Sequence, residues 1–109
     1  MGGILLEVRT SMDDRILTVT LRGELDHHAA RGTVTAIERA IEASLPKQLM
    51  LDFRGVSFMD SSGIAVAMRA RKSMETLGGG AEIVHVPAQA KKVFDAAGIR
   101  CQAETEEKK

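Results

Sequence analysis

Two short segments of this chain concentrate the side chains that can take part in chemistry. The first, residues 23–28, reads Gly-Glu-Leu-Asp-His-His, and the second, residues 57–63, reads Ser-Phe-Met-Asp-Ser-Ser-Gly. Each carries a carboxylate, the first adds two imidazoles, and the second adds hydroxyl groups. Each also stands where a strand is expected to give way to a helix, and such loops are favoured places for recognition. We therefore expect any binding or modification site to lie in these two segments.

The second segment has more helix-capping residues than one helix start requires. Asp60, Ser61 and Ser62 all carry side-chain oxygens that can accept a hydrogen bond from an unpaired N–H group at a helix N-terminus, where one such residue suffices. Phe58 and Met59 place bulky apolar groups beside these oxygens. Capping alone explains one of the three polar residues, and the whole combination favours a docking loop.

A serine at a helix start is also suited to be a phosphorylation switch. A phosphate adds about −1.5 to −2 charges, and the helix dipole tolerates an anion at this end of the helix. A partner that buries the loop would have to remove that charge from water beside Asp60, which is costly unless the partner supplies cations. Phosphorylation of the loop is therefore expected to switch binding off and to leave the fold intact.

The histidines give little support to a metal site or to catalysis. His27 and His28 are adjacent, so on a helix they point in different directions and cannot share a metal ion as a pair four residues apart would. Ser61 lies in a partial match to the Gly-x-Ser-x-Gly nucleophile elbow, but Met59 replaces the first glycine and no histidine follows His85. We predict no metal site and no enzyme activity, with a serine hydrolase as the disfavoured alternative.

Composition narrows the class of protein. The chain has 109 residues, the size of one domain, and its apolar fraction of 44% includes no Trp, no Tyr and three Phe. A core built from aliphatic residues suits an α/β domain. Fifteen basic residues balance fifteen acidic ones, so there is no broad positive field to hold nucleic acid.

The same sequence predicts a cytoplasmic protein. Cys101 is the single cysteine and cannot form an internal disulfide, which fits a reducing compartment. No apolar run approaches the roughly 18 residues of a membrane span, and the first residues do not resemble a signal peptide. We therefore expect no membrane insertion.

Hydrophobic periodicity predicts the elements that position the two segments. Strands are expected at residues 4–9, 16–21, 49–53 and 82–86, with a turn at 11–14 that makes the first two an antiparallel hairpin and with a half-buried His85 in the last. Helices are expected at about 26–45, ended by Pro46; at about 61–77, ended by three glycines; and from Pro87 to Gly98. The second helix should face the sheet with Ile64, Ala67, Ala70, Met74 and Leu77, and the third with Ala90, Val93, Phe94 and Ala97.

The expected architecture is an αβ sandwich with a mixed four- to five-stranded sheet, an N-terminal antiparallel hairpin and three helices. One domain would span residues 1–103, and residues 104–109 would form a charged tail.

The two segments together resemble those of a known family. Gly-Glu-Leu-Asp-His-His at 23–28 and Phe-Met-Asp-Ser-Ser-Gly at 58–63 look like the motifs of STAS domains of bacterial anti-anti-sigma factors, the anti-sigma factor antagonists that include those of sporulation. The resemblance covers residues 4–100, and the order of elements is similar to that of the family. It implies a STAS-like fold.

The resemblance also implies a partner-switching cycle. An anti-sigma factor serine kinase would phosphorylate Ser61 with its own ATP, so this chain would need no cofactor. The unmodified protein would bind that kinase and free the sigma factor, and a PP2C-type phosphatase would reset the switch. The partner-binding residues would be Glu24, Asp26, His27, Met59, Asp60, Ser62 and Gly63.

We expect the free protein to be a monomer. The alternative function is that of a STAS subunit in a larger stress-sensing or lipid-transport assembly.

Overall fold

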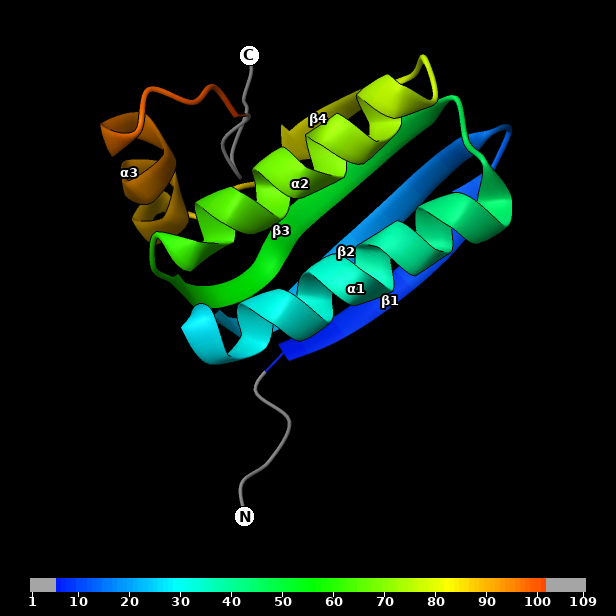
Figure 1. Ribbon diagram of the computed structural model, residues 1–109. Coiled ribbons are helices and arrows are strands. Elements are labelled where there is room, and N and C mark those ends of the chain that lie inside the picture. The colour runs from blue at the N-terminus through cyan, green and yellow to red at the C-terminus, as the bar shows by residue number, and fades with distance from the viewer. Residues whose placement is uncertain (1–5, 102–109) are drawn as a thin grey trace.

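A mixed four-stranded sheet organises the chain. The computed structural model describes residues 6–101, so the predicted tail 104–109 lies outside the described residues. The elements in chain order are β1 (Leu6–Asp13), β2 (Ile16–Leu25), α1 (His27–Ser44), β3 (Gln48–Met59), α2 (Ser62–Thr76), β4 (Gly80–Val84) and α3 (Ala88–Ala96). The strand order is β1-β2-β3-β4, with β1 antiparallel to β2 and the other pairs parallel (Figure 1). The predicted fold class is confirmed.

Helices α1 and α2 lie side by side over one face of the sheet (Figure 1). This follows from the strand order, because the crossovers β2-α1-β3 and β3-α2-β4 step in the same direction and both are expected to be right-handed. The core between these layers consists of aliphatic side chains. It includes Leu17, Val19 and Leu21 of β2, Leu49 and Leu51 of β3, Ile37 and Ile41 of α1, and Val66, Ala67, Ala70 and Met74 of α2.

Helix α3 packs near the carboxyl end of β3, beside the start of α2 (Figure 1). Phe94 of α3 and Phe53 of β3 are both fully buried, and their rings meet edge to face with centroids 5.4 Å apart. Such aromatic pairs add to the free energy of burial. This contact fixes α3 against the end of the sheet where α2 begins.

Three strands run further than the sequence predicted. Strand β1 continues to Asp13, so the turn expected at 11–14 is wrong: the hairpin turns at Asp14 and Arg15. The run 49–53 is only the start of β3, which continues to Met59, and β2 continues to Leu25. Beyond Thr20 the pairing of β2 with β3 is irregular, with register shifts between Thr20 and Arg22 and between Gly23 and Glu24. A bulged extension of this kind has no simple alternation of apolar and polar residues, so periodicity does not reveal it.

Several residues at the ends of elements differ from expectation. Leu77 was predicted to face the sheet but is the C-cap residue of α2 and is 44% exposed. Ala97 likewise lies just beyond α3 and is exposed. His85 was predicted inside a strand but follows β4 with a φ of 56°, because β4 runs from Gly80 to Val84.

In the described part of the chain, no helix combines the length and the apolar character that crossing a membrane requires.

Candidate functional site

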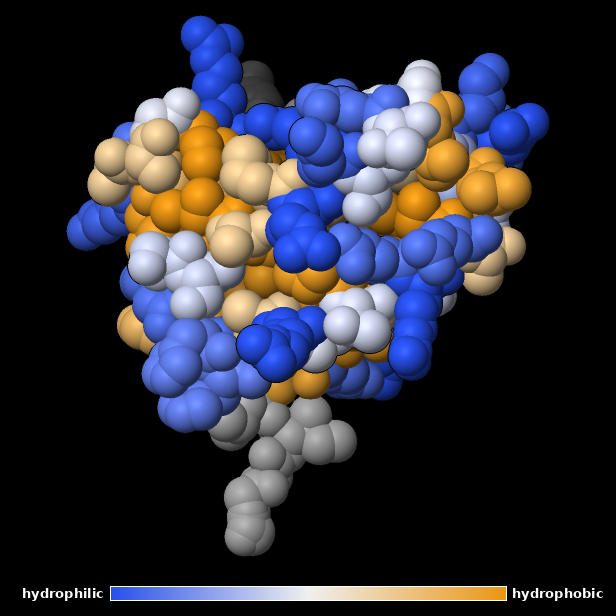
Figure 2. All heavy atoms as spheres, viewed as in Figure 1, coloured by the Kyte–Doolittle hydropathy of each residue, from blue (hydrophilic) through white to orange (hydrophobic). Residues whose placement is uncertain are grey.

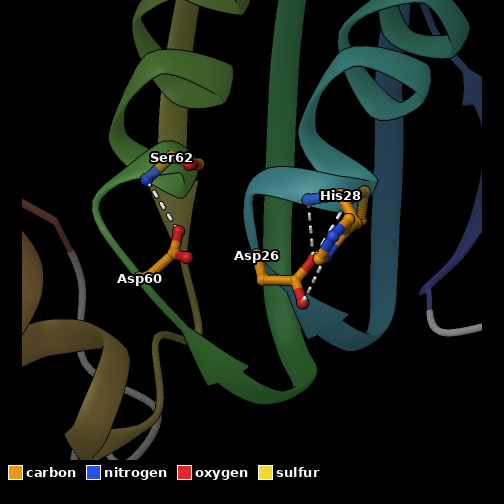
Figure 3. A network of polar contacts seen from close by, with 5 residues as sticks. Asp26, His28, Asp60 and Ser62 are labelled. Carbon is orange, nitrogen blue, oxygen red and sulfur yellow. Dashed lines mark hydrogen bonds and ion pairs between the residues drawn. The ribbon is translucent and has the colours of Figure 1, made fainter.

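The fold brings the two predicted segments together at one edge of the sheet. Strands β2 and β3 are parallel neighbours, and their last paired residues are Leu25 and Met59. The chain enters α1 directly after Leu25 and α2 shortly after Met59, so both helix starts lie next to each other (Figure 3). The N–H of Asp60 also donates to the carbonyl oxygen of Leu25 at 3.4 Å. The carboxyl ends of adjacent parallel strands are a common place for ligand sites.

Asp26 caps the first helix. Its Oδ1 accepts hydrogen bonds from the backbone N–H groups of His28 at 3.0 Å and Ala29 at 3.1 Å, and its Oδ2 lies 3.7 Å from Nδ1 of His28 (Figure 3). Burial raises the pKa of this carboxyl, but the two backbone bonds and the nearby His28 ring outweigh that effect. The pKa of Asp26 is therefore held below its ordinary value of 3.8.

Asp60 and Ser61 differ in the hydrogen bonds that they make at the start of α2. Asp60 Oδ1 accepts a hydrogen bond from the backbone N–H of Ser62 at 2.8 Å (Figure 3). Ser61 stands at the N-cap position of α2, yet its side chain makes no capping hydrogen bond and it is exposed. The hydroxyl of Ser61 is therefore available to react without removing the bond that Asp60 makes.

Gly63 lets the start of α2 approach the end of β3. A Cβ atom at this position would lie 2.4 Å from both Cγ and Sδ of Met59 and 3.2 Å from Cδ2 of Leu25. Real Cβ atoms almost never come this close to another heavy atom. Glycine at position 63 thus sets the distance between residues 60–62 and the sheet.

The side chain of Met59 packs against the start of α2 at Gly63. This side chain has no exposed surface, whereas that of Phe58, on the opposite face of β3, is 44% exposed. The expectation that the Met59 side chain forms part of an apolar rim open to a partner is therefore wrong for this structure. Phe58 is the exposed apolar group, and it pairs across the strands with the exposed Glu24.

A comparison with known families agrees with this geometry. The family model described as STAS domain matches residues 7–108. The chain belongs to the STAS domain family.

Relatives within the family carry regulatory names. An anti-sigma F factor antagonist of Lysinibacillus sphaericus is 30% identical over 83 residues, which is 76% of this chain and 71% of the relative. The solved structure of the anti-sigma factor antagonist SpoIIAA in its unphosphorylated form is 27% identical, with a TM-score of 0.78 over 93% of this chain and 90% of that one. The phosphorylated form of SpoIIAA, a Bacillus cell fate determinant, is also 27% identical, with a TM-score of 0.70 over 93% of each chain.

One contributor to the site of this STAS domain was not expected from the sequence. Gln89 of α3 accepts a hydrogen bond from the N–H of Met59 at 2.8 Å and donates one to the carbonyl oxygen of Met59 at 2.9 Å. Strand β4 pairs with β3 only as far as Asp52, so Gln89 supplies the bonds that a neighbouring strand would otherwise make. A lone glutamine on a short amphipathic helix gave no signal of this role.

The histidines of the STAS domain differ slightly from expectation. The rings of His27 and His28 lie 4.0 Å apart and tilted by 37°, so they contact each other although they are adjacent in α1. Both are exposed, as Glu24 is, and they border the site on the α1 side. Among residues 6–101, no three His, Cys, Asp or Glu side chains gather closely enough to hold a metal ion.

Proposed function

We propose that this STAS domain is an anti-sigma factor antagonist. Its unmodified form binds an anti-sigma factor serine kinase and thereby releases a sigma factor. Phosphorylation of Ser61 by that kinase ends the binding, and a PP2C-type phosphatase restores it. The protein acts by binding in the cytoplasm and carries no cofactor, because the ATP belongs to the kinase. The family membership and the relatives named as antagonists support this class of function.

The exposed hydroxyl of Ser61 carries the proposal. It projects from the N-cap position of α2 and makes no capping hydrogen bond, while the Asp60 carboxylate bonds the N–H of Ser62. A kinase can therefore modify Ser61 without uncapping the helix. Phosphate at this end of α2 is favoured by the helix dipole, so the free domain keeps its fold after modification.

Charge explains why phosphorylation would end the binding. A partner covering Ser61 must also cover the neighbouring Asp60 and the α1 start, where Asp26 already bonds two backbone N–H groups. The added phosphate would be removed from water beside the Asp60 carboxylate. Such burial is costly unless the partner supplies cations at the same place.

Phosphate mapping tests the acceptor. The protein is incubated with its anti-sigma factor kinase and ATP, and the modified residue is identified by mass spectrometry. We expect one phosphate on Ser61, retained in Ser62→Ala and lost in Ser61→Ala. Ser62 is the matched control because it is the adjacent hydroxyl in the same loop. Phosphate elsewhere, or none, contradicts the proposal.

Binding measurements test the charge mechanism separately. Titration calorimetry against the kinase should give Ser61→Ala an affinity close to that of the unmodified protein. Ser61→Asp should bind at least about 10-fold more weakly, which corresponds to about 1.4 kcal/mol. Circular dichroism should show the same fold for both variants. Equal affinities of Ser61→Asp and Ser61→Ala would refute the mechanism.

A further inference from the structure

A groove between α2 and α3 opens beside the acceptor serine. It has a volume of about 460 Å³, and its lining is mostly apolar. The lining residues are Ser61 and Ile64 from the α2 side and Gln89, Lys92, Val93, Ala96 and Ala97 from the α3 side. Figure 2 shows apolar side chains gathered where α3 lies beside the start of α2. Ser61 therefore faces α3 as well as solvent.

Lys92 is the cationic side chain of this groove. Within residues 6–101, the structure shows no hydrogen bond or ion pair made by the side chain of Lys92, which is exposed. The adjacent Lys91 differs, because its Nζ lies 2.9 Å from Oδ2 and 3.2 Å from Oδ1 of Asp95. Lys91 also lines a separate cavity, with Cys101 and others. The two neighbouring lysines thus have distinct surroundings.

We propose that Lys92 pairs with the phosphate on Ser61 across this groove and holds the phosphoserine against α3. The proposal rests on the proposed function, since it concerns the phosphorylated state of Ser61. The lysine ammonium is a compact charge on a flexible four-carbon stem, which suits a phosphate that is fixed on the opposite wall. Through Lys92, α3 would then recognise the phosphorylated form of Ser61.

The other charged groups near Ser61 leave Lys92 as the compensating cation. Asp60 is negative and opposes the phosphate. Gln89 is neutral, and its amide is engaged with the backbone of Met59. On the α1 side, Asp26 is bound to the helix start and lies close to His28. Lys92 is the one cation among the lining residues of the groove.

A pairing of this kind changes how the phosphate titrates. The second pKa of phosphoserine is ordinarily about 6. A lysine nearby favours the dianion over the monoanion, so it lowers that pKa. For charges about 4 Å apart in water the lowering is about 0.7 unit, and screening at about 0.1 M salt reduces it to roughly 0.5 unit. Asp60 raises the same pKa, but it is present equally in every variant compared.

Phosphorus NMR measures this directly. Phosphoserine is installed at position 61 during translation, and the phosphate is titrated in the otherwise native chain, in Lys92→Gln and in Lys91→Gln. We expect the pKa to be about 0.5 unit higher in Lys92→Gln than in the native chain. Lys91→Gln is the matched control, because it removes an adjacent charge that is held by Asp95. The difference should shrink between about 0.01 M and 1 M salt.

A second observable is the resonance of the Lys92 side-chain methylene next to the ammonium, which should shift when Ser61 carries phosphate. Equal phosphate pKa values in Lys92→Gln and the native chain, or an equal rise in Lys91→Gln, would overturn the pairing. No kinase enters this experiment, so its failure leaves the proposed function standing. Conversely, a kinase that ignores Ser61 would refute the proposed function without altering this titration.

Discussion

Replacing Gly63 with alanine should destabilise the site at its most tightly packed point. The new Cβ would lie 2.4 Å from Cγ and Sδ of Met59. These atoms belong to the middle of a side chain that has no exposed surface, so Met59 cannot simply swing into solvent. The start of α2 or the end of β3 must move instead, and residues 60–62 lie where these two elements meet.

The size of the effect follows from two opposed contributions. Overpacking a well-filled site costs about 1–3 kcal/mol. Alanine in place of glycine favours a helix by at most about 1 kcal/mol, and less in the first turn, where Gly63 lies. We expect Gly63→Ala to lower the free energy of unfolding by about 1–2 kcal/mol, or to lower Tm by roughly 5–15 °C.

Gly32 provides the matched control. It also lies in a helix, but a Cβ atom there would meet nothing within 4 Å. Gly32→Ala should therefore raise the free energy of unfolding by about 0.5–1 kcal/mol through helix propensity alone. Both variants are compared by urea unfolding followed by circular dichroism, with the m-value as a check that the two-state model holds.

The outcome that refutes the packing argument is a Gly63→Ala protein at least as stable as the native one. A double variant sharpens the test. In a Met59→Ala background the clash is gone, so Gly63→Ala should cost less there than in the native chain, with a coupling of about 1 kcal/mol. Equal costs in both backgrounds would show that Met59 is not the obstacle.

Three further predictions concern the site at Asp26 and Gln89 and the separate surroundings of Cys101. Asp26→Ala should lower Tm at neutral pH, and the gap from the native protein should narrow as the pH falls below 3.8 through the lowered carboxyl pKa; a constant gap in Tm scans would contradict this. Gln89→Ala should cost about 1–2 kcal/mol and speed hydrogen exchange of the Met59 amide, which should otherwise be protected. Burial raises the pKa of the Cys101 thiol above 9.0 while Lys91 lowers it, so iodoacetamide should modify Cys101 more slowly than free cysteine, and more slowly still in Lys91→Gln.

The sequence predicted the helix boundaries well because strong local signals mark them. Asp26 was placed at the start of the first helix and is its N-cap. Pro46 was expected to end that helix, and Leu45 before it is the C-cap with a left-handed backbone. Gly98 was expected to close the third helix and has a φ of 75°. Each signal acts within a few residues, so no tertiary information was needed.

The parts that escaped prediction depend on contacts between distant segments. The extension of β3 to Met59 exists because β2 continues alongside it, with two register shifts, the first of which ends at the pair of Arg22 and Gly55. A Cβ atom at Gly55 would lie 3.0 Å from Cγ of Arg22, so glycine permits the close approach. The division of roles between Asp60 and Ser61 was equally hidden, because both are good capping residues and only the local backbone decides which one bonds.

Strand register places the starts of α1 and α2 at the same edge of the sheet. Leu25 and Met59 are 34 positions apart but form the last pair of adjacent parallel strands, so whatever follows each of them must emerge at the same edge. A change of register in β2 or β3 would move one helix start past the other and would turn buried side chains outward. The register shifts after Thr20 therefore help to position the two helix starts, because they set how far each strand runs before Asp26 and Ser61 begin their helices.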